Sequence, residues 1–151
     1  MQGLGLCLWL VGAKSNPWNG IVREVHESLQ LRGQCRPHVR LQSHLKLATM
    51  PEVPPSARAK ITGGLFAVTT EFPGWPPLQT IELPVALDID HGEDTHLSLA
   101  HRFGVEPFTM DDVHKVKAVL ADYGDWEECT LYPILANMKV PDPNKWRDIS
   151  P

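Results

Sequence analysis

The sequence predicts an α+β domain in which two main helices accompany mixed or antiparallel sheets. Three observations favour this class. Segments follow one another in the order strand, helix, several strands, helix, strand, which is not the regular alternation of a parallel α/β sheet. The 151 residues fit a single domain spanning 1–151. With 42% hydrophobic residues, the chain has enough apolar side chains to build a core.

The first third of the chain divides into a strand, a helix and a second strand. The apolar run "LCLWLVG" at 6–12 is typical of a buried strand. A helix follows, with Asn16 suited to the N-cap, Pro17 to the first helical position and Gly33 to the residue after its end. Its apolar positions recur at helical spacing and are Trp18, Ile21, Val22, Val25 and Leu29.

The rest of the chain supplies further strands and a second helix. Three prolines within 48–60 predict a loop. The helix is expected over 108–124, since Thr109 and Asp112 have the spacing of a capping box and Gly124 follows the apolar stripe. We expect strands at 61–70, 78–89, 95–103, 128–140 and, as a short final strand, 145–150.

Residues 36–47, "RPHVRLQSHLKL", alternate polar and apolar side chains without interruption. Because successive side chains of a strand point to opposite faces, one face is predicted to be apolar. The other face is predicted to carry His38, Arg40, Gln42, His44 and Lys46, with His44 at the rim. A basic face in a chain of net charge −4 argues against a general nucleic-acid coat and favours a local site for a small anion.

A second strand-like segment repeats the pattern of the first. "PHVRL" places His38 and Arg40 on one face, and "THLSL" places His96 and Ser98 on one face. If the two strands are neighbours, the two imidazoles face each other across a cleft. Such a pair suits phosphodiester cleavage, since a neutral imidazole takes a proton from water and a protonated one gives a proton to the leaving oxygen. Arg40 and Ser98 are suited to hold the non-bridging oxygens.

Two motifs of the form His-x-Ser/Thr-x on two strands resemble the 2H phosphoesterase superfamily, which includes LigT-like RNA phosphoesterases and cyclic phosphodiesterases. The nearest likeness is to the plant and fungal cyclic phosphodiesterases, through "LWL", an amphipathic helix, "PHVRLQSHL", "HLSLAHRF" and a late tryptophan. The resemblance covers about residues 6–47 and 95–149 and implies a compact bilobal fold with a trimmed middle lobe. It also implies that His38 and His96 are catalytic, that Ser98 binds phosphate, and that no metal or other cofactor takes part.

The first motif departs from the family pattern, because Arg40 stands where the family has Thr or Ser. Arginine binds phosphate strongly, and its length either crowds the pocket or converts a catalytic cleft into an anion clamp. Trp75 is a candidate for stacking on a base, and Arg102 shares the parity of His96 and is a second candidate for phosphate. His101 has the opposite parity and is expected to point away from the cleft.

We expect a metal-independent phosphodiesterase, and the resemblance implies that its substrates are 2′,3′-cyclic or ADP-ribose 1″,2″-cyclic phosphates, or 2′,5′-linked or cyclic oligonucleotides. The expected partner is a small nucleotide or an RNA end, and the expected state is a monomer that binds no membrane. Three widely spaced cysteines, Cys7, Cys35 and Cys129, favour a reduced, cytoplasmic protein. Two alternatives stay open, a non-catalytic nucleotide or RNA-end binder on the same fold and an interaction subunit of a larger assembly.

Overall fold

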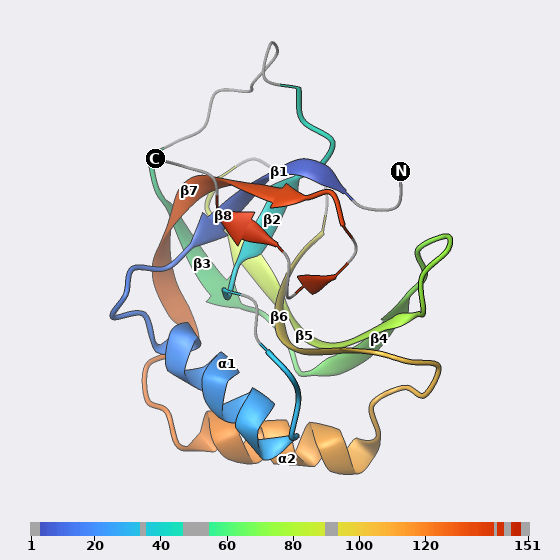
Figure 1. The fold of residues 1–151 in the computed structure, drawn as a ribbon. Coiled ribbons are helices and arrows are strands. Elements are labelled where there is room, and N and C mark those ends of the chain that lie inside the picture. Colours follow the sequence, from blue (N-terminus) through green and yellow to red (C-terminus); the bar gives the residue numbers. More distant parts are fainter. Residues whose placement is uncertain are drawn as a thin grey trace.

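The computed structural model describes residues 4–33, 36–46, 55–89, 94–140, 142–143 and 146–148. Two helices and eight strands lie within these residues, and all paired strands run antiparallel (Figure 1). The predicted α+β class with two main helices is confirmed. In chain order the elements are β1 (Gly5–Val11), α1 (Pro17–Ser28), β2 (Val39–Gln42), β3 (Ala57–Ile61), β4 (Phe66–Thr70), β5 (Leu78–Leu87), β6 (Thr95–Phe103), α2 (Met110–Ala121), β7 (Glu128–Met138) and β8 (Arg147–Asp148).

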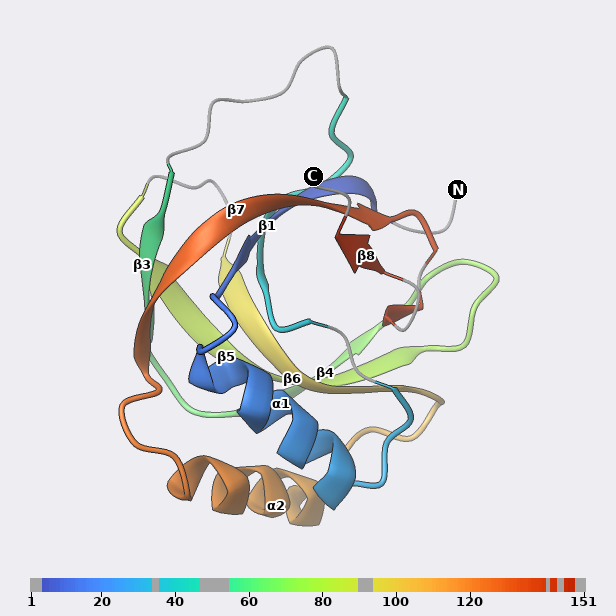
Figure 2. The same cartoon turned by 60° about the vertical axis from the view of Figure 1, so that its left-hand side comes forward.

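The sheet closes on itself. Its strands follow the order β1-β2-β6-β5-β3-β7, and β7 pairs with β1 again, from Gly5 opposite Met138 to Val11 opposite Tyr132. β4 adds to β5, and β8 adds to β7. Figure 2 shows the barrel-like curve that results, with the two helices side by side against it. Closure gives β1 a hydrogen-bonded neighbour on each side, so this apolar strand has no open edge.

The two faces of the sheet carry different cores. Leu10, Val39, Leu97 and Leu83 are successive cross-strand partners on one face, and they belong to the larger apolar cluster, which includes both helices. The opposite face carries a smaller cluster around Trp9, which is 1% exposed. The polar side chains described below lie on this second face. The residues on one face of the central strands therefore pack against the helices, and the residues on the other face line the site.

Both helices begin where the sequence predicts. At α1 the Trp18 N–H donates a hydrogen bond of 2.8 Å to the Asn16 side chain, and Pro17 is the first helical residue. At α2 the Thr109 hydroxyl accepts from the Asp112 N–H, and the Asp112 carboxylate accepts from the Thr109 N–H, which completes the capping box. These local bonds satisfy N–H groups that the first turn of a helix leaves without intrahelical partners.

The end of α1 lies earlier than Gly33. The helix stops at Ser28 because Gln30 adopts a left-handed backbone conformation, with φ of 56°. The Leu31 N–H then donates to the His26 carbonyl at 2.8 Å, which satisfies one of the last carbonyls of the helix. A non-glycine residue ends this helix, so the C-terminal boundary predicted from Gly33 lies several residues too late.

One predicted loop and one predicted strand have different bounds. β3 begins at Ala57, inside the segment 48–60 that was expected to be a loop. Residues 48–54 of that segment lie outside the described part of the chain. The predicted strand at 61–70 is the end of β3 and the whole of β4. β3 pairs with β5 on one side and β7 on the other, so long-range pairing sets its bounds. In the described ranges, neither helix is long and apolar enough to cross a membrane.

Candidate active site

A cavity of about 410 Å³ is lined by the polar face of β2, β5 and β6, by side chains of β4, and by the last turns of α1. This volume lies in the range of small-molecule sites, roughly 300–1,000 Å³. Several cationic or titratable nitrogen-bearing side chains converge on it, namely His26, Arg36, His38, Arg40, His96 and His101. The basic groups that the sequence distributes over three segments thus meet at one site.

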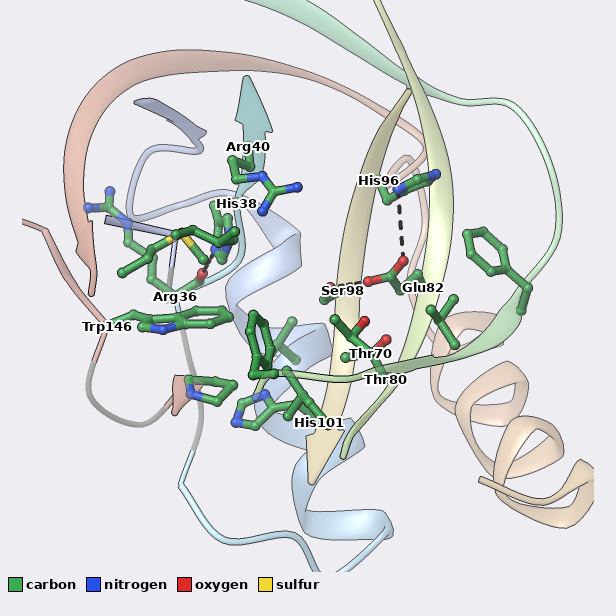
Figure 3. A pocket seen from close by; sticks show the side chains of 18 of the residues that line it. Arg36, His38, Arg40, Thr70, Thr80, Glu82, His96, Ser98, His101 and Trp146 are labelled. Carbon is green, nitrogen blue, oxygen red and sulfur yellow. Dashed lines mark hydrogen bonds and ion pairs between the residues drawn. The ribbon is translucent and has the colours of Figure 1, made fainter. Parts of the chain in front are cut away.

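The two histidine motifs lie side by side. β2 and β6 are antiparallel neighbours, so the condition under which the two motifs share a cleft is met. Val39 pairs with Leu97, so Arg40 of β2 lies opposite His96 of β6. His38, which immediately precedes β2, and Ser98 line the same cavity as these two residues (Figure 3).

His38 is fixed by its neighbours just before β2 begins. Its ring stacks on the indole of Trp9, with centroids 3.7 Å apart and planes inclined by 7°. Its Nδ1 lies 2.8 Å from the Arg36 carbonyl oxygen, and because a carbonyl only accepts, Nδ1 carries the proton and Nε2 keeps a lone pair in the neutral ring. Burial lowers the pKa of His38 to about 4, the Arg36 hydrogen bond opposes this shift, and the Arg40 charge adds to it. His38 is therefore neutral at pH 7.

His96 lies beside a carboxylate that the sequence reasoning missed. Its Nδ1 is 3.8 Å from Glu82 Oε1, an ion-pair distance when the imidazole is protonated, and 40% of its side chain is exposed. The Ser98 hydroxyl donates a hydrogen bond of 2.9 Å to the other Glu82 oxygen. Ser98 therefore directs its proton to Glu82 rather than into the cavity. The signal was available, since Glu82 is the one acidic residue inside the apolar run "LQTIELPVAL".

A β-bulge in β2 ends the uninterrupted alternation that the sequence shows. Arg40 pairs with Trp9 and Gln42 pairs with Leu8, so Leu41 is an extra residue on this strand. An extra residue changes which face the following side chains occupy. The later polar residues of the stretch are exposed to solvent and do not line the cavity. These residues are Gln42, His44 and Lys46. Only the first two members of the predicted basic face, His38 and Arg40, belong to the site.

A second bulge, at Leu99 in β6, corrects the prediction for His101. Before the bulge Ser98 pairs with Glu82, and after it His101 pairs with Thr80. The extra residue inverts the alternation, so His101 shares the cavity face with Ser98 and is 8% exposed. The expectation that His101 points away from the cleft was wrong, because it assumed an unbroken strand.

The two remaining predicted binding residues lie outside the cavity lining. The same bulge turns Arg102 away, where it donates to carbonyls of residues 106–107 and lies 4.3 Å from the ring centroid of Phe108. Trp75, in the loop between β4 and β5, packs against Phe103 with ring centroids 5.8 Å apart. The structure therefore does not bring Arg102 or Trp75 to the histidine pair.

The floor of the cavity contains a second pair of histidines. His26, on the apolar face of α1, packs edge-on against His101, with ring centroids 4.7 Å apart. Its Nδ1 lies 2.6 Å from the Gly33 carbonyl oxygen, so Nδ1–H donates and Nε2 keeps the lone pair. Burial lowers the pKa of His26, and the Gly33 hydrogen bond partly opposes this. Among the described residues, His26 Nε2 and the Thr80 hydroxyl are buried without hydrogen-bond partners.

Within the described part of the chain, no three His, Cys, Asp or Glu side chains gather closely enough to hold a metal ion. A scan against protein-family models found no match, and a search of curated proteins found no significant relative. The chemistry of the cavity is therefore the basis for assigning a function.

Proposed function

We propose that the protein is a phosphodiesterase of the 2H type that opens a cyclic phosphate on a small nucleotide. One observation carries the proposal: His38, Arg40, His96 and Ser98 share one face of two paired strands and line one cavity. The proposal includes the compact bilobal 2H arrangement and a cytoplasmic monomer. It assigns the proton transfers to imidazoles, as the resemblance implies.

His38 is the proposed general base. It is neutral at pH 7, and with Nδ1–H donated to the Arg36 carbonyl, the lone pair of the ring lies at Nε2. Nε2 takes a proton from water while the water oxygen bonds to phosphorus. A bound phosphodiester anion offsets the Arg40 charge and so favours proton uptake by His38.

His96 is the proposed general acid. As the phosphorus–oxygen bond to the ribose breaks, His96 gives its proton to the leaving oxygen, and a nucleoside monophosphate results. Glu82 lies beside Nδ1 and leaves Nε2 for the substrate, while Ser98 holds the Glu82 carboxylate in place. Ser98 is thus a positioning residue in this proposal. Arg40, opposite His96, binds the non-bridging oxygens.

The test is hydrolysis of a panel that contains 2′,3′-cyclic mononucleotides, ADP-ribose 1″,2″-cyclic phosphate and 2′,5′-linked dinucleotides. His38→Gln and His96→Gln should each lower kcat by roughly 10²–10⁴-fold, the usual contribution of general acid–base catalysis. His44→Gln is the matched control, since His44 is exposed outside the cavity lining. Unchanged hydrolysis of every substrate by both site variants contradicts the proposal.

The second candidate is a non-catalytic binder of nucleotides or RNA ends on the same fold. It is favoured by the position of Arg40, which lies between the two histidines in Figure 3, where the family pattern has a small hydroxyl residue. Guanidinium groups hold phosphate through charge-assisted hydrogen bonds, which slows release. Tight binding of a cyclic nucleotide without any product after long incubation supports this binder over the enzyme.

A further inference from the structure

A second cavity, of about 330 Å³, adjoins the cavity of the proposed active site. His101 lines both cavities, while Pro143 lines the first and its chain neighbour Asp142 lines the second. Figure 3 shows His101 at the end of the first cavity that lies away from Arg40 and His96. A ligand that extends past His101 therefore passes from the first cavity into the second.

Two arginines, Arg32 and Arg102, line the second cavity, and neither forms an ion pair with another described residue. Arg102, predicted from the sequence as a ligand for phosphate, donates from Nη2 to the carbonyls of residues 106–107 and lies 4.3 Å from the Phe108 ring centroid. Nε and Nη1 keep their N–H groups for a ligand. The Arg102 guanidinium is thus held in place by groups that carry no net charge.

Arg32 is held beside the second cavity by the residues on either side of it. The Leu31 N–H donates to the His26 carbonyl at 2.8 Å, and His26 Nδ1–H donates to the Gly33 carbonyl at 2.6 Å. The His26 ring in turn packs against His101. The loop after α1 is therefore tied to the wall between the two cavities, while the Arg32 side chain is exposed and makes no hydrogen bond with the described residues.

The composition of the second cavity matches one further unit of a nucleotide chain. Two arginines and one carboxylate, that of Asp142, give its lining a formal charge of +1. The Phe103 ring adds an aromatic surface of the kind on which bases stack. Along β6, Arg102 lies four positions after Ser98, one of which is the bulge residue, so the two are roughly 10 Å apart along the strand. A ligand with a single phosphate therefore occupies one of the two cationic sites at a time.

We infer that the second cavity binds an upstream phosphate of a nucleotide chain, so that an RNA end of two or more nucleotides is preferred to a mononucleotide. Arg32 and Arg102 hold this phosphate through charge-assisted hydrogen bonds, and Phe103 contacts the base attached to it. The terminal phosphate lies between His38 and His96. The inference rests on the proposed function, since it names the substrate class of the same site.

Equilibrium binding by calorimetry tests the inference on the full chain without requiring turnover. The probes are uridine 3′-monophosphate and the uridine di- and trinucleotides that end in the same 3′-monophosphate. The tighter of the two longer probes should bind roughly 10- to 150-fold more tightly than the mononucleotide, the range for hydrogen bonds to a charged group. Its affinity should also fall more steeply with salt, by about 0.7 in the slope of log K against log salt for one further phosphate contact. Equal affinities for the three probes overturn the inference.

Arg32→Gln assigns the effect of length to the second cavity. Because Arg32 is exposed, the urea midpoint should not change. The affinity for the longer probe should fall roughly 5- to 12-fold, between the effect of an exposed ion pair and that of a charge-assisted hydrogen bond, and the affinity for the mononucleotide should stay the same. Arg23→Gln, at an exposed residue of α1 outside both cavities, removes the same charge and is the matched control. No loss for the longer probe, or an equal loss for the mononucleotide or in Arg23→Gln, overturns the inference.

ADP-ribose 1″-phosphate supplies a second phosphate site from a pyrophosphate instead of a nucleotide strand. It should bind more weakly than the longer uridine probe, because its terminal ribose carries no base to contact the apolar residues of the first cavity, Val68, Phe72 and Leu78. Tighter binding of ADP-ribose 1″-phosphate than of either oligonucleotide assigns the second cavity to a pyrophosphate and overturns the inference.

The two proposals fail separately. Hydrolysis of cyclic phosphates at the ends of mononucleotides and oligonucleotides with equal kcat/KM, and with equal affinities for the uridine probes, leaves the enzyme standing and removes the second phosphate site. Length-dependent binding with no hydrolysis keeps the second site and favours the binder over the enzyme.

Discussion

Acidification is expected to destabilise the protein through His38 in particular. The pKa of this imidazole is about 4 in the folded chain, against 6.5 for an ordinary histidine. Between these two values the unfolded chain binds a proton that the folded chain does not, so the free energy of unfolding falls as the pH drops from 6.5 towards 4. The stabilisation is fully present above pH 6.5. A difference of 2.5 pKa units, at about 1.4 kcal/mol each, gives about 3 kcal/mol.

The assay is urea unfolding of the wild type and His38→Gln at about pH 7.5, 6.5, 5.5 and 4.5. The wild type should lose about 2–3 kcal/mol more than the variant across this range. His26, whose pKa is also lowered by burial, contributes equally to both proteins and cancels in the comparison. Parallel curves, within roughly 0.5 kcal/mol, would show that His38 titrates like an exposed histidine and would refute the lowered pKa on which its proposed role as a neutral base depends.

Three further outcomes are expected. Glu82→Gln should lower KM for a cyclic phosphate roughly fivefold, because a negative charge beside the proposed phosphate site is removed, and like unit charges about 4 Å apart in water repel by about 1 kcal/mol. The variant should also lower kcat, and steady-state kinetics with an unchanged kcat would contradict the role of Glu82 beside His96. Arg40→Thr should raise the dissociation constant for a nucleotide roughly 10- to 150-fold, since hydrogen bonds to a charged partner are lost. Calorimetry that shows no weakening of binding would exclude Arg40 as the phosphate ligand. Thr109→Ala should lower the free energy of unfolding by about 1 kcal/mol, because the α2 capping box is lost, and an effect below a few tenths in urea unfolding would contradict that.

Local signals predicted much of the fold. The Asn16 cap and the Thr109–Asp112 box involve residues within four positions of each other, so the sequence alone defines both helix starts. The strand at 95–103 was predicted with the bounds of β6, because its alternation and its flanking turns are local as well. The matched parity of the two motifs predicted a shared cleft on the condition that their strands are neighbours, and β2 and β6 are neighbours.

The parts of the site that escaped prediction depend on pairing between distant strands. A bulge is defined by its partner strand, so nothing near Leu41 or Leu99 in the sequence shows that the alternation changes there. Glu82 and His26 carried a weaker signal, since Glu82 is the one acidic residue of an apolar run and His26 is a polar residue on the apolar face of α1.

The closure of the sheet has a consequence for the order of folding. β1 and β7 pair over residues that lie 121 to 133 positions apart in the chain, from Val11 opposite Tyr132 to Gly5 opposite Met138. Contacts of such long range form slowly, because the entropy of closing the loop is lost before the contact is gained. Trp9, which stacks on His38, lies opposite Arg40 on β2, a pairing over 31 positions that does not depend on β7. During synthesis the sheet therefore closes only after β7 has left the ribosome, and Met138, the β7 residue that lines the cavity, joins the proposed site later than the residues of β2 and β6.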